Sequence, residues 1–161
     1  MKVLFLDIDG VLNYEGCDSR YGSVYFVMEE KVHMLKEIIS KTDAKIVLTS
    51  TWRHGLTDLM LGEETFEAGL YEAFINTLEE HDMEIYGCTG EDEATRGEEI
   101  EFWLQVAEEK IEGFVILDDM GPEQFCAYEP YLVQTALSVG LEQEHVNLVI
   151  NMLNEELEDK K

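Results

Sequence analysis

The stretch "VLFLDIDGVLN", Val3 to Asn13, opens the chain with a short aliphatic run that ends on two carboxylates, Asp7 and Asp9. A bounded aliphatic run of this length is typical of a buried strand. In a strand-like backbone, side chains two residues apart point to the same side, so both carboxylates are expected to project together. Two like charges this close require a cation or a shared proton.

Short aliphatic runs recur along the chain and alternate with longer stretches of helical period. The runs are "VLFLD" (3–7), "KIVLTS" (45–50), "MEIYGCT" (83–89), "FVILDD" (114–119) and "YLVQT" (131–135). Apolar residues at helical spacing mark four helices: Met28, Val32, Leu35 and Ile39; Phe66, Leu70, Phe74 and Leu78; Ile100, Trp103, Leu104, Ala107 and Ile111; Val146, Val149, Ile150, Leu153 and Leu157. The alternation predicts an α/β fold with a central parallel sheet of about five strands and helices on both faces.

Acids and hydroxyls stand at the carboxyl ends of the predicted strands, where ligands bind in open α/β sheets. Asp7 ends the first run, "TST" (49–51) ends the second, and Asp118 and Asp119 end the fourth. A hard divalent cation with oxygen ligands resolves the repulsion between such carboxylates, and Mg²⁺ is the cation that we expect. Asp7 and Asp9 would share it with Asp118 or Asp119.

Two other aspartate-rich folds fit the sequence less well. An EF-hand loop starting at Asp7 would place Leu12 where glycine is required and Asp18 where a bidentate glutamate is required. A phosphoacceptor receiver domain would place its acidic pair on the first strand and a lone aspartate in mid-chain. Here the adjacent pair, Asp118 and Asp119, comes late, so the order of the motifs disfavours a receiver domain.

The composition indicates one acidic domain. The 161 residues, 45% of them hydrophobic, suffice for one core, so residues 1–161 are expected to form a single domain with a frayed acidic tail at about 155–161. The formal net charge is -25, and the first 60 residues carry only -2 of it. Such a surface repels phosphate backbones, which disfavours a long nucleic-acid tract as a partner.

Cysteine usage and hydropathy favour a cytoplasmic, soluble protein. Cys17, Cys88 and Cys126 are an odd number at unrelated spacings, and no signal peptide precedes them. No apolar run approaches the roughly 20 residues that a membrane span needs. We therefore expect a reducing environment and no membrane partner; the oligomeric state stays open.

The order of these motifs resembles that of the haloacid dehalogenase (HAD) superfamily of aspartate-nucleophile phosphatases over nearly the whole chain. "LDIDGVL" looks like the first motif, the hydroxyl in "IVLTST" like the second, the cation of "TRGEEIEFWL" like the third and "VILDD" like the fourth. "DIDGVLN", "TSTWR", "LDD" and "VQT...GL" (133–141) together look like the small HAD domains grouped with bacterial and phage nucleic-acid-repair proteins. The resemblance implies a three-layer Rossmannoid fold.

The resemblance also implies a Mg²⁺-dependent phosphomonoesterase. Asp7 would attack phosphorus and become an aspartyl phosphate, and Asp9 would protonate the leaving alcohol and later deprotonate water. Mg²⁺ would be held by Asp7, by the backbone carbonyl of Asp9 and by the late acid pair, with the roles of Asp118 and Asp119 left open.

The remaining site residues would bind phosphate. Ser50 is the preferred second-motif hydroxyl, with Thr49 and Thr51 as alternatives. Arg96, 22 residues before Asp118, would be the third-motif cation, unless it is a surface residue. Two further predictions are that Arg53 meets the substrate, unless "WRH" merely opens a helix, and that Gly10 lets the chain pass close to the phosphate.

The segments between the motifs leave no room for a large cap domain. Residues 12–27 are expected to form either a small flap whose aromatic residues face the site or an ordinary hairpin that covers the core; the aromatic residues are Tyr14, Tyr21, Tyr25 and Phe26. An open site of this kind suits a phosphorylated small molecule, such as a nucleotide, or a polynucleotide end. The alternative is a catalytically silent HAD-like module that binds Mg²⁺ or a partner.

Overall fold

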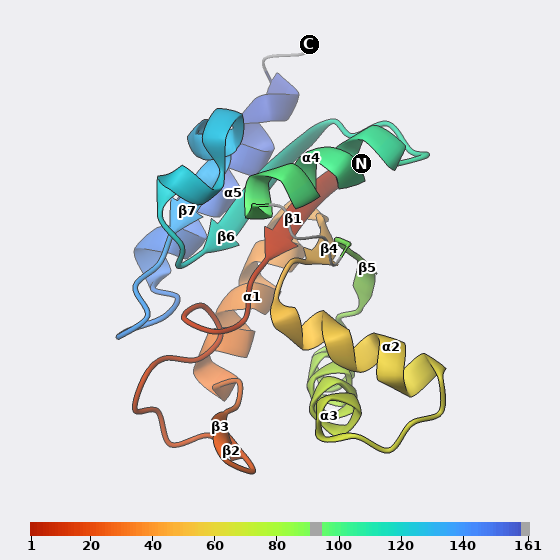
Figure 1. Cartoon of the computed structure of the whole chain (residues 1–161). Helices are drawn as coiled ribbons and strands as arrows, with labels where there is room; N and C mark the ends of the chain where they lie inside the picture. Colours follow the sequence, from red (N-terminus) through yellow and green to blue (C-terminus); the bar gives the residue numbers. More distant parts are fainter. Residues whose placement is uncertain (91–94, 159–161) are drawn as a thin grey trace.

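A five-stranded parallel sheet forms the centre of the computed structural model, which describes residues 1–90 and 95–158, with side chains up to residue 155 (Figure 1). Its strands are β1 (Lys2–Leu6), β4 (Lys45–Leu48), β5 (Ile85–Cys88), β6 (Gly113–Asp118) and β7 (Leu132–Gln134). They lie in the order β5-β4-β1-β6-β7, and every neighbouring pair is parallel. The predicted parallel α/β sheet is confirmed, with β1 at its centre.

Helices cover both faces of this sheet, which makes three layers (Figure 1). The buried residues of β1 alternate between two clusters: Leu4 and Leu6 pack in one, Val3 and Phe5 in the other. The first cluster includes residues of α1 (Glu29–Thr42), α3 (Phe66–Glu80) and α5 (Gln143–Glu158). The second includes Ile100 of α4 (Arg96–Val106), together with Phe125 between the 3-10 helices η2 (Pro122–Gln124) and η3 (Cys126–Tyr131). Burial on both faces explains why β1 reads as an uninterrupted aliphatic run.

Some boundaries differ from the sequence prediction. Helix α4 ends at Val106, because Ala107 has an extended backbone, so the predicted stripe through Ile111 runs too far. After β4, a short 3-10 helix η1 (Thr51–Arg53) leads into helix α2 (His54–Met60), which the apolar pattern did not mark. Helix α5 reaches Glu158, so the expected tail at 155–161 is helical in its first part; residues 159–161 lie outside the described part of the chain.

A small hairpin stands in the place of the predicted flap. Strands β2 (Arg20–Tyr21) and β3 (Val24–Tyr25) pair antiparallel, and Gly22 adopts a positive φ of 58° in their turn. The Tyr21 ring packs 5.4 Å from that of Phe66 at the start of α3. Within the described residues, the segments between β1 and α4 hold only this hairpin and the elements already named, so the expected absence of a large cap is confirmed.

None of the described helices combines the length and the apolar character required of a membrane-spanning segment.

Candidate active site

The carboxyl ends of β1, β4 and β6 meet at one edge of the sheet. The N–H of Asp7, just after β1, donates to the carbonyl of Leu117 in β6 at 3.0 Å. The N–H of Thr49, just after β4, donates to the carbonyl of Leu6 at 2.9 Å. The parallel ladder thus continues one residue past each strand and brings the residues that follow the three strands together.

Three aspartates form a carboxylate group at this edge: Asp7, Asp118 and Asp119. Each offers an oxygen that lies within 4.8 Å of those of the other two. Asp118 is fully buried, Asp7 is 5% exposed and Asp119 is half-buried. The Asp118 carboxylate also accepts a hydrogen bond of 2.9 Å from the N–H of Met120, which fixes its direction.

Arg96 brings a positive charge to the carboxylate group. Its Nη1 lies 2.8 Å from Oδ2 of Asp118 and 3.4 Å from Oδ1 of Asp7, and its side chain is only 9% exposed. Arg96 is the first residue of α4, and Thr95 and Glu98 cap that end of the helix reciprocally. This capping box fixes where the helix begins and therefore where the arginine projects.

The charges in this group do not balance. Burial raises the pKa of Asp7 well above its ordinary value, the charge of Asp118 raises it further, and Arg96 offsets only part of the effect. Burial and the charge of Asp118 also raise the pKa of Asp119. Burial disfavours the charged form of Arg96, but the carboxylates of Asp118 and Asp7 outweigh it and raise the pKa of the guanidinium. When ionised, three carboxylates beside one guanidinium carry an excess of negative charge that a cation would neutralise.

Asp9 has different partners from Asp7. Its carboxylate accepts hydrogen bonds from Nδ2 of Asn13 at 3.0 Å and from Nε1 of Trp52 at 3.1 Å. The sequence predicted a strand-like backbone from Asp7 to Asp9, but β1 ends at Leu6. A helical turn follows over residues 8–12, in which the N–H groups of Val11 and Leu12 donate to the carbonyl of Ile8. The carboxylate of Asp9 is therefore fixed beside Trp52, outside the carboxylate group described above.

Gly10 allows the first turn to pass directly beside Asp119. Its φ is +80°, and a Cβ built at this position would lie 2.5 Å from Oδ2 of Asp119. The carbonyl of Gly10 accepts a hydrogen bond from the hydroxyl of Thr135 after β7. Any other residue here would strain the backbone and displace an oxygen of the carboxylate group.

The three hydroxyls after β4 differ in their surroundings. Ser50 is 1% exposed, and its Oγ caps η1 by accepting a hydrogen bond of 3.2 Å from the N–H of Trp52. Thr49 is fully buried, and its Oγ1 has no hydrogen-bond partner in the described part of the chain. Thr51 is exposed. All three therefore stay candidates for the phosphate-binding hydroxyl.

Arg53 is buried against the protein. Its guanidinium donates hydrogen bonds to the carbonyls of Thr49, Ser50 and Gly90 and lies 3.3 Å from Oε1 of Glu99 in α4. Sequence reasoning expected this arginine to meet the substrate. In the structure, its contacts tie the end of β4 to α4.

A cavity of about 250 Å³ adjoins Asp9 and reaches residues that the sequence did not single out for function. It is lined by Asp9, Val24, Thr51, Trp52, Phe66, Glu67 and Leu70. Phe26 supports the wall by stacking on Trp52, with ring centroids 5.9 Å apart. The hairpin lies within the predicted flap, whereas α3 is far from Asp9 in sequence, and no local motif marks the contribution of Phe66 and Leu70 to the site.

The comparisons with known proteins agree with this arrangement. No curated protein and no solved structure matches the chain significantly. One family model does: residues 3–146 match the HAD domain in Swiss Army Knife RNA repair proteins. The match spans every strand of the sheet and all the site residues discussed above, in agreement with the resemblance inferred from the motifs. The chain therefore belongs to the family of HAD domains found in Swiss Army Knife RNA repair proteins.

Proposed function

We propose that the protein is a Mg²⁺-dependent phosphomonoesterase that acts through an aspartyl phosphate on Asp7. The observation that carries this proposal is the carboxylate group of Asp7, Asp118 and Asp119 with Arg96 against it. A nucleophile, metal ligands and a cation for the phosphoryl oxygens are the parts that phosphoryl transfer to a carboxylate requires. Membership of the HAD family supports the same reaction class.

The carboxylate group fits a magnesium ion. Its donors are hard carboxylate oxygens from three residues. Burial, and after it the charge of Asp118, raises the pKa of Asp7 and of Asp119, so a bound cation would favour the ionised carboxylates that the surroundings alone disfavour. Asp7, Asp118 and Asp119 would hold the ion, with the backbone carbonyl of Asp9 as a further oxygen donor. When bound, Mg²⁺ supplies charge neutralisation on the phosphoryl oxygens.

Asp7 has the surroundings that we expect of the attacking group. Its carboxylate is nearly buried and lies 3.4 Å from Nη1 of Arg96, so a phosphoryl group placed on Asp7 would meet this guanidinium. The guanidinium would stabilise the negative charge that moves onto the phosphoryl oxygens during attack. One of the hydroxyls of Thr49, Ser50 and Thr51, at the end of the neighbouring strand, would donate a further hydrogen bond to the same oxygens, and Ser50 is the preferred one.

Asp9 would act on the leaving group. It borders the 250 Å³ cavity, while the donors on Asn13 and Trp52 hold its carboxylate in one orientation. A proton on this carboxylate would pass to the leaving alcohol, and the carboxylate would then accept a proton from the attacking water. The two aspartates of the first motif thus take separate tasks in separate surroundings.

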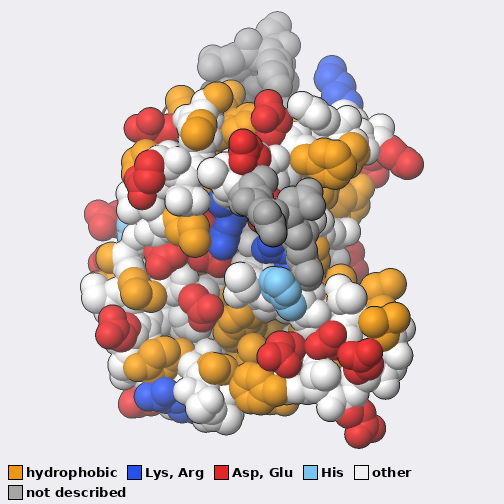
Figure 2. Space-filling model, in the orientation of Figure 1, with side chains coloured by type: hydrophobic (Ala, Val, Ile, Leu, Met, Phe, Trp, Pro, Cys, Tyr) orange, Lys and Arg blue, Asp and Glu red, His pale blue; other side chains and the backbone are white. Residues whose placement is uncertain are grey.

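The substrate that we propose is a nucleotide or the terminal phosphate of a polynucleotide. The cavity beside Asp9 has the aromatic side chains of Trp52 and Phe66 in its wall, which suits a flat apolar group next to the phosphate. Acidic side chains are spread over the face shown in Figure 2, and the formal net charge is -25. Such a surface opposes a long nucleic-acid tract, so recognition would be confined to the end that carries the phosphate.

Phosphate release from p-nitrophenyl phosphate, a nucleotide panel and end-phosphorylated oligonucleotides tests this proposal, with Mg²⁺ or with EDTA. We expect turnover that requires Mg²⁺, is lost in Asp7→Asn and persists in the matched exposed-site control Asp18→Asn. Activity of Asp7→Asn at the wild-type rate would rule out Asp7 as nucleophile. Binding of Mg²⁺ without turnover of any of these esters would favour the alternative, a silent HAD-like module.

A further inference from the structure

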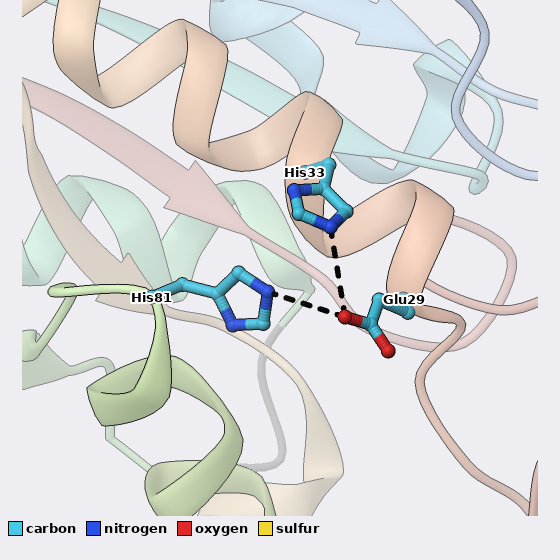
Figure 3. A group of neighbouring side chains, drawn as sticks. All are labelled: Glu29, His33 and His81. Atoms are coloured by element: carbon cyan, nitrogen blue, oxygen red, sulfur yellow. Dashed lines mark ion pairs between the residues drawn. The ribbon is translucent and has the colours of Figure 1, made fainter.

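Two side chains of α1 and one from the residue after α3 meet at a place that the proposed reaction does not use (Figure 3). Nε2 of His33 lies 3.6 Å from Oε1 of Glu29, and Nε2 of His81 lies 3.8 Å from the same oxygen. The two imidazole rings contact each other edge to face, with centroids 4.9 Å apart. The three potential ligand atoms all lie within 4.8 Å of one another, so one ion would reach all of them.

The helices explain why these side chains converge. Glu29 is the first residue of α1, and His33 lies one turn later on the same face of that helix. His81 follows the last residue of α3 and projects from the facing element, as Figure 3 shows. The cluster therefore bridges the start of one helix and the end of another.

A hydrogen bond sets the ring nitrogen that His81 presents to the cluster. Nδ1 of His81 lies 2.9 Å from the carbonyl oxygen of Thr77, and a carbonyl only accepts. In the neutral ring, Nδ1 therefore carries the hydrogen, and Nε2 presents its lone pair to Glu29 and His33. Metal-binding histidines are commonly oriented by a hydrogen bond from the ring nitrogen that does not bind the metal to a backbone carbonyl. His81 makes such a hydrogen bond, and its side chain is only 14% exposed.

We propose that Glu29, His33 and His81 bind a zinc ion. Two imidazole nitrogens and one carboxylate oxygen are a ligand set that suits Zn²⁺, with water in the fourth position. Imidazole nitrogen is a poor ligand for Mg²⁺, so this site and the all-carboxylate group around Asp7 select different ions. The bound zinc cross-links α1 to α3 and so stabilises the folded protein, because the unfolded chain does not hold the three ligands together.

Metal titration of the whole protein tests the site. With excess Mg²⁺ present to occupy the carboxylate group, we expect one equivalent of Zn²⁺ to bind in calorimetry, and Co²⁺ to give the visible absorption of a four-coordinate centre. Glu29→Gln, His33→Ala and His81→Ala should each weaken binding by at least about 10- to 100-fold, the loss found when only an outer-shell partner of a metal ligand is removed. The double variant His33→Ala, His81→Ala should remove the Co²⁺ absorption.

Two matched variants keep the test specific. Glu30→Gln changes the adjacent exposed acid, and His145→Ala removes a histidine at the start of α5; both should bind Zn²⁺ like the wild type. Circular dichroism establishes that each variant is folded, and the Zn²⁺-dependent rise in melting temperature should disappear only in the cluster variants. The proposal is overturned if the wild type binds no stoichiometric Zn²⁺, or if the double variant binds it unchanged. Because phosphatase activity is not the readout, failure here leaves the proposed reaction intact.

Discussion

Nη1 of Arg96 lies 2.8 Å from Oδ2 of Asp118, so the first residue of α4 is paired with the last residue of β6. The pair is almost completely buried, with side-chain exposures of 9% and 0%. Removing one member of a buried ion pair leaves an uncompensated charge. The contact therefore ties the start of α4 to the edge of the sheet and places a cation beside Asp7.

Replacing Arg96 should impair catalysis more than folding alone explains. We expect Arg96→Ala to lower kcat by about 10²- to 10³-fold, the range found when a group that stabilises developing charge is removed. Arg96→Lys should retain part of the activity, because the charge remains. Steady-state kinetics on protein shown to be folded measures both, and Lys45→Ala, at the exposed start of β4, is the control. Wild-type kcat in Arg96→Ala would exclude this residue as the phosphate cation.

The stability of the metal-free protein should depend on pH through Asp7. Burial raises the pKa of Asp7 above its ordinary value of 3.8, so the folded state keeps a proton that the unfolded chain has lost. The free energy of unfolding should then fall as the pH rises from 3.8 to the folded pKa, and stay low above it. In Asp7→Asn the free energy of unfolding should fall less with pH. The stability of this variant relative to the wild type should therefore increase between pH 3.8 and the folded pKa of Asp7.

Urea unfolding in EDTA at a series of pH values measures this effect. Added Mg²⁺ should restore stability to the wild type above the folded pKa of Asp7, and should do so less for Asp7→Asn. A wild type that becomes more stable relative to Asp7→Asn as the pH rises would contradict the raised pKa.

The role of Asp9 should depend on the leaving group. We expect Asp9→Ala to lower kcat/KM by about 10²- to 10⁴-fold on a nucleotide, whose alcohol needs a proton to depart. The loss should be much smaller on p-nitrophenyl phosphate, because nitrophenolate leaves without one. Parallel kinetics on the two esters gives the comparison. Equal losses on both would show that Asp9 does not act as the general acid.

Comparing alanine variants of Gly10 and Gly16 distinguishes the effect of backbone strain from the effect of crowding at the metal site. Both have a positive φ, +80° and +87°, but a Cβ at Gly10 meets Asp119 at 2.5 Å, whereas one at Gly16 meets nothing within 4 Å. Each alanine variant should cost about 1–2 kcal/mol of stability from the left-handed backbone. Only Gly10→Ala should also weaken Mg²⁺ binding, measured by calorimetry. Unchanged Mg²⁺ affinity in Gly10→Ala would mean that Asp119 does not hold the ion.

Phe66 should matter for large substrates. It lines the cavity beside Asp9, so Phe66→Ala should raise KM for a nucleotide with little change in KM for a small alkyl phosphate. Phe102→Ala on α4 is a matched control, since Phe102 is similarly exposed, at 56% against 45% for Phe66. If Phe66→Ala changed KM equally for both substrates, or if Phe102→Ala changed KM as much as Phe66→Ala, the cavity would not be part of the substrate-binding site.

The fold could be predicted because its signals are local. Each strand of the sheet is a short aliphatic run, and β1 is buried on both faces, so no polar residue interrupts it. Helix α4 was predicted too long, because Ile111 stays in apolar contact with the second cluster after the helix has ended. Apolar spacing reports burial, and burial continues where the backbone hydrogen bonds of the helix do not.

The parallel sheet, the order of the motifs and the acids at the strand ends can be predicted from the sequence alone, since they follow from hydrophobic runs and from neighbours along the chain. Which carboxylates share a site depends on how the strands and turns pack in three dimensions. Asp7 joins Asp118 across the sheet, whereas Asp9, two residues away from Asp7, pairs with Trp52. The reason is that β1 ends before Asp7 and the chain turns at once, so sequence spacing no longer fixes the direction of a side chain.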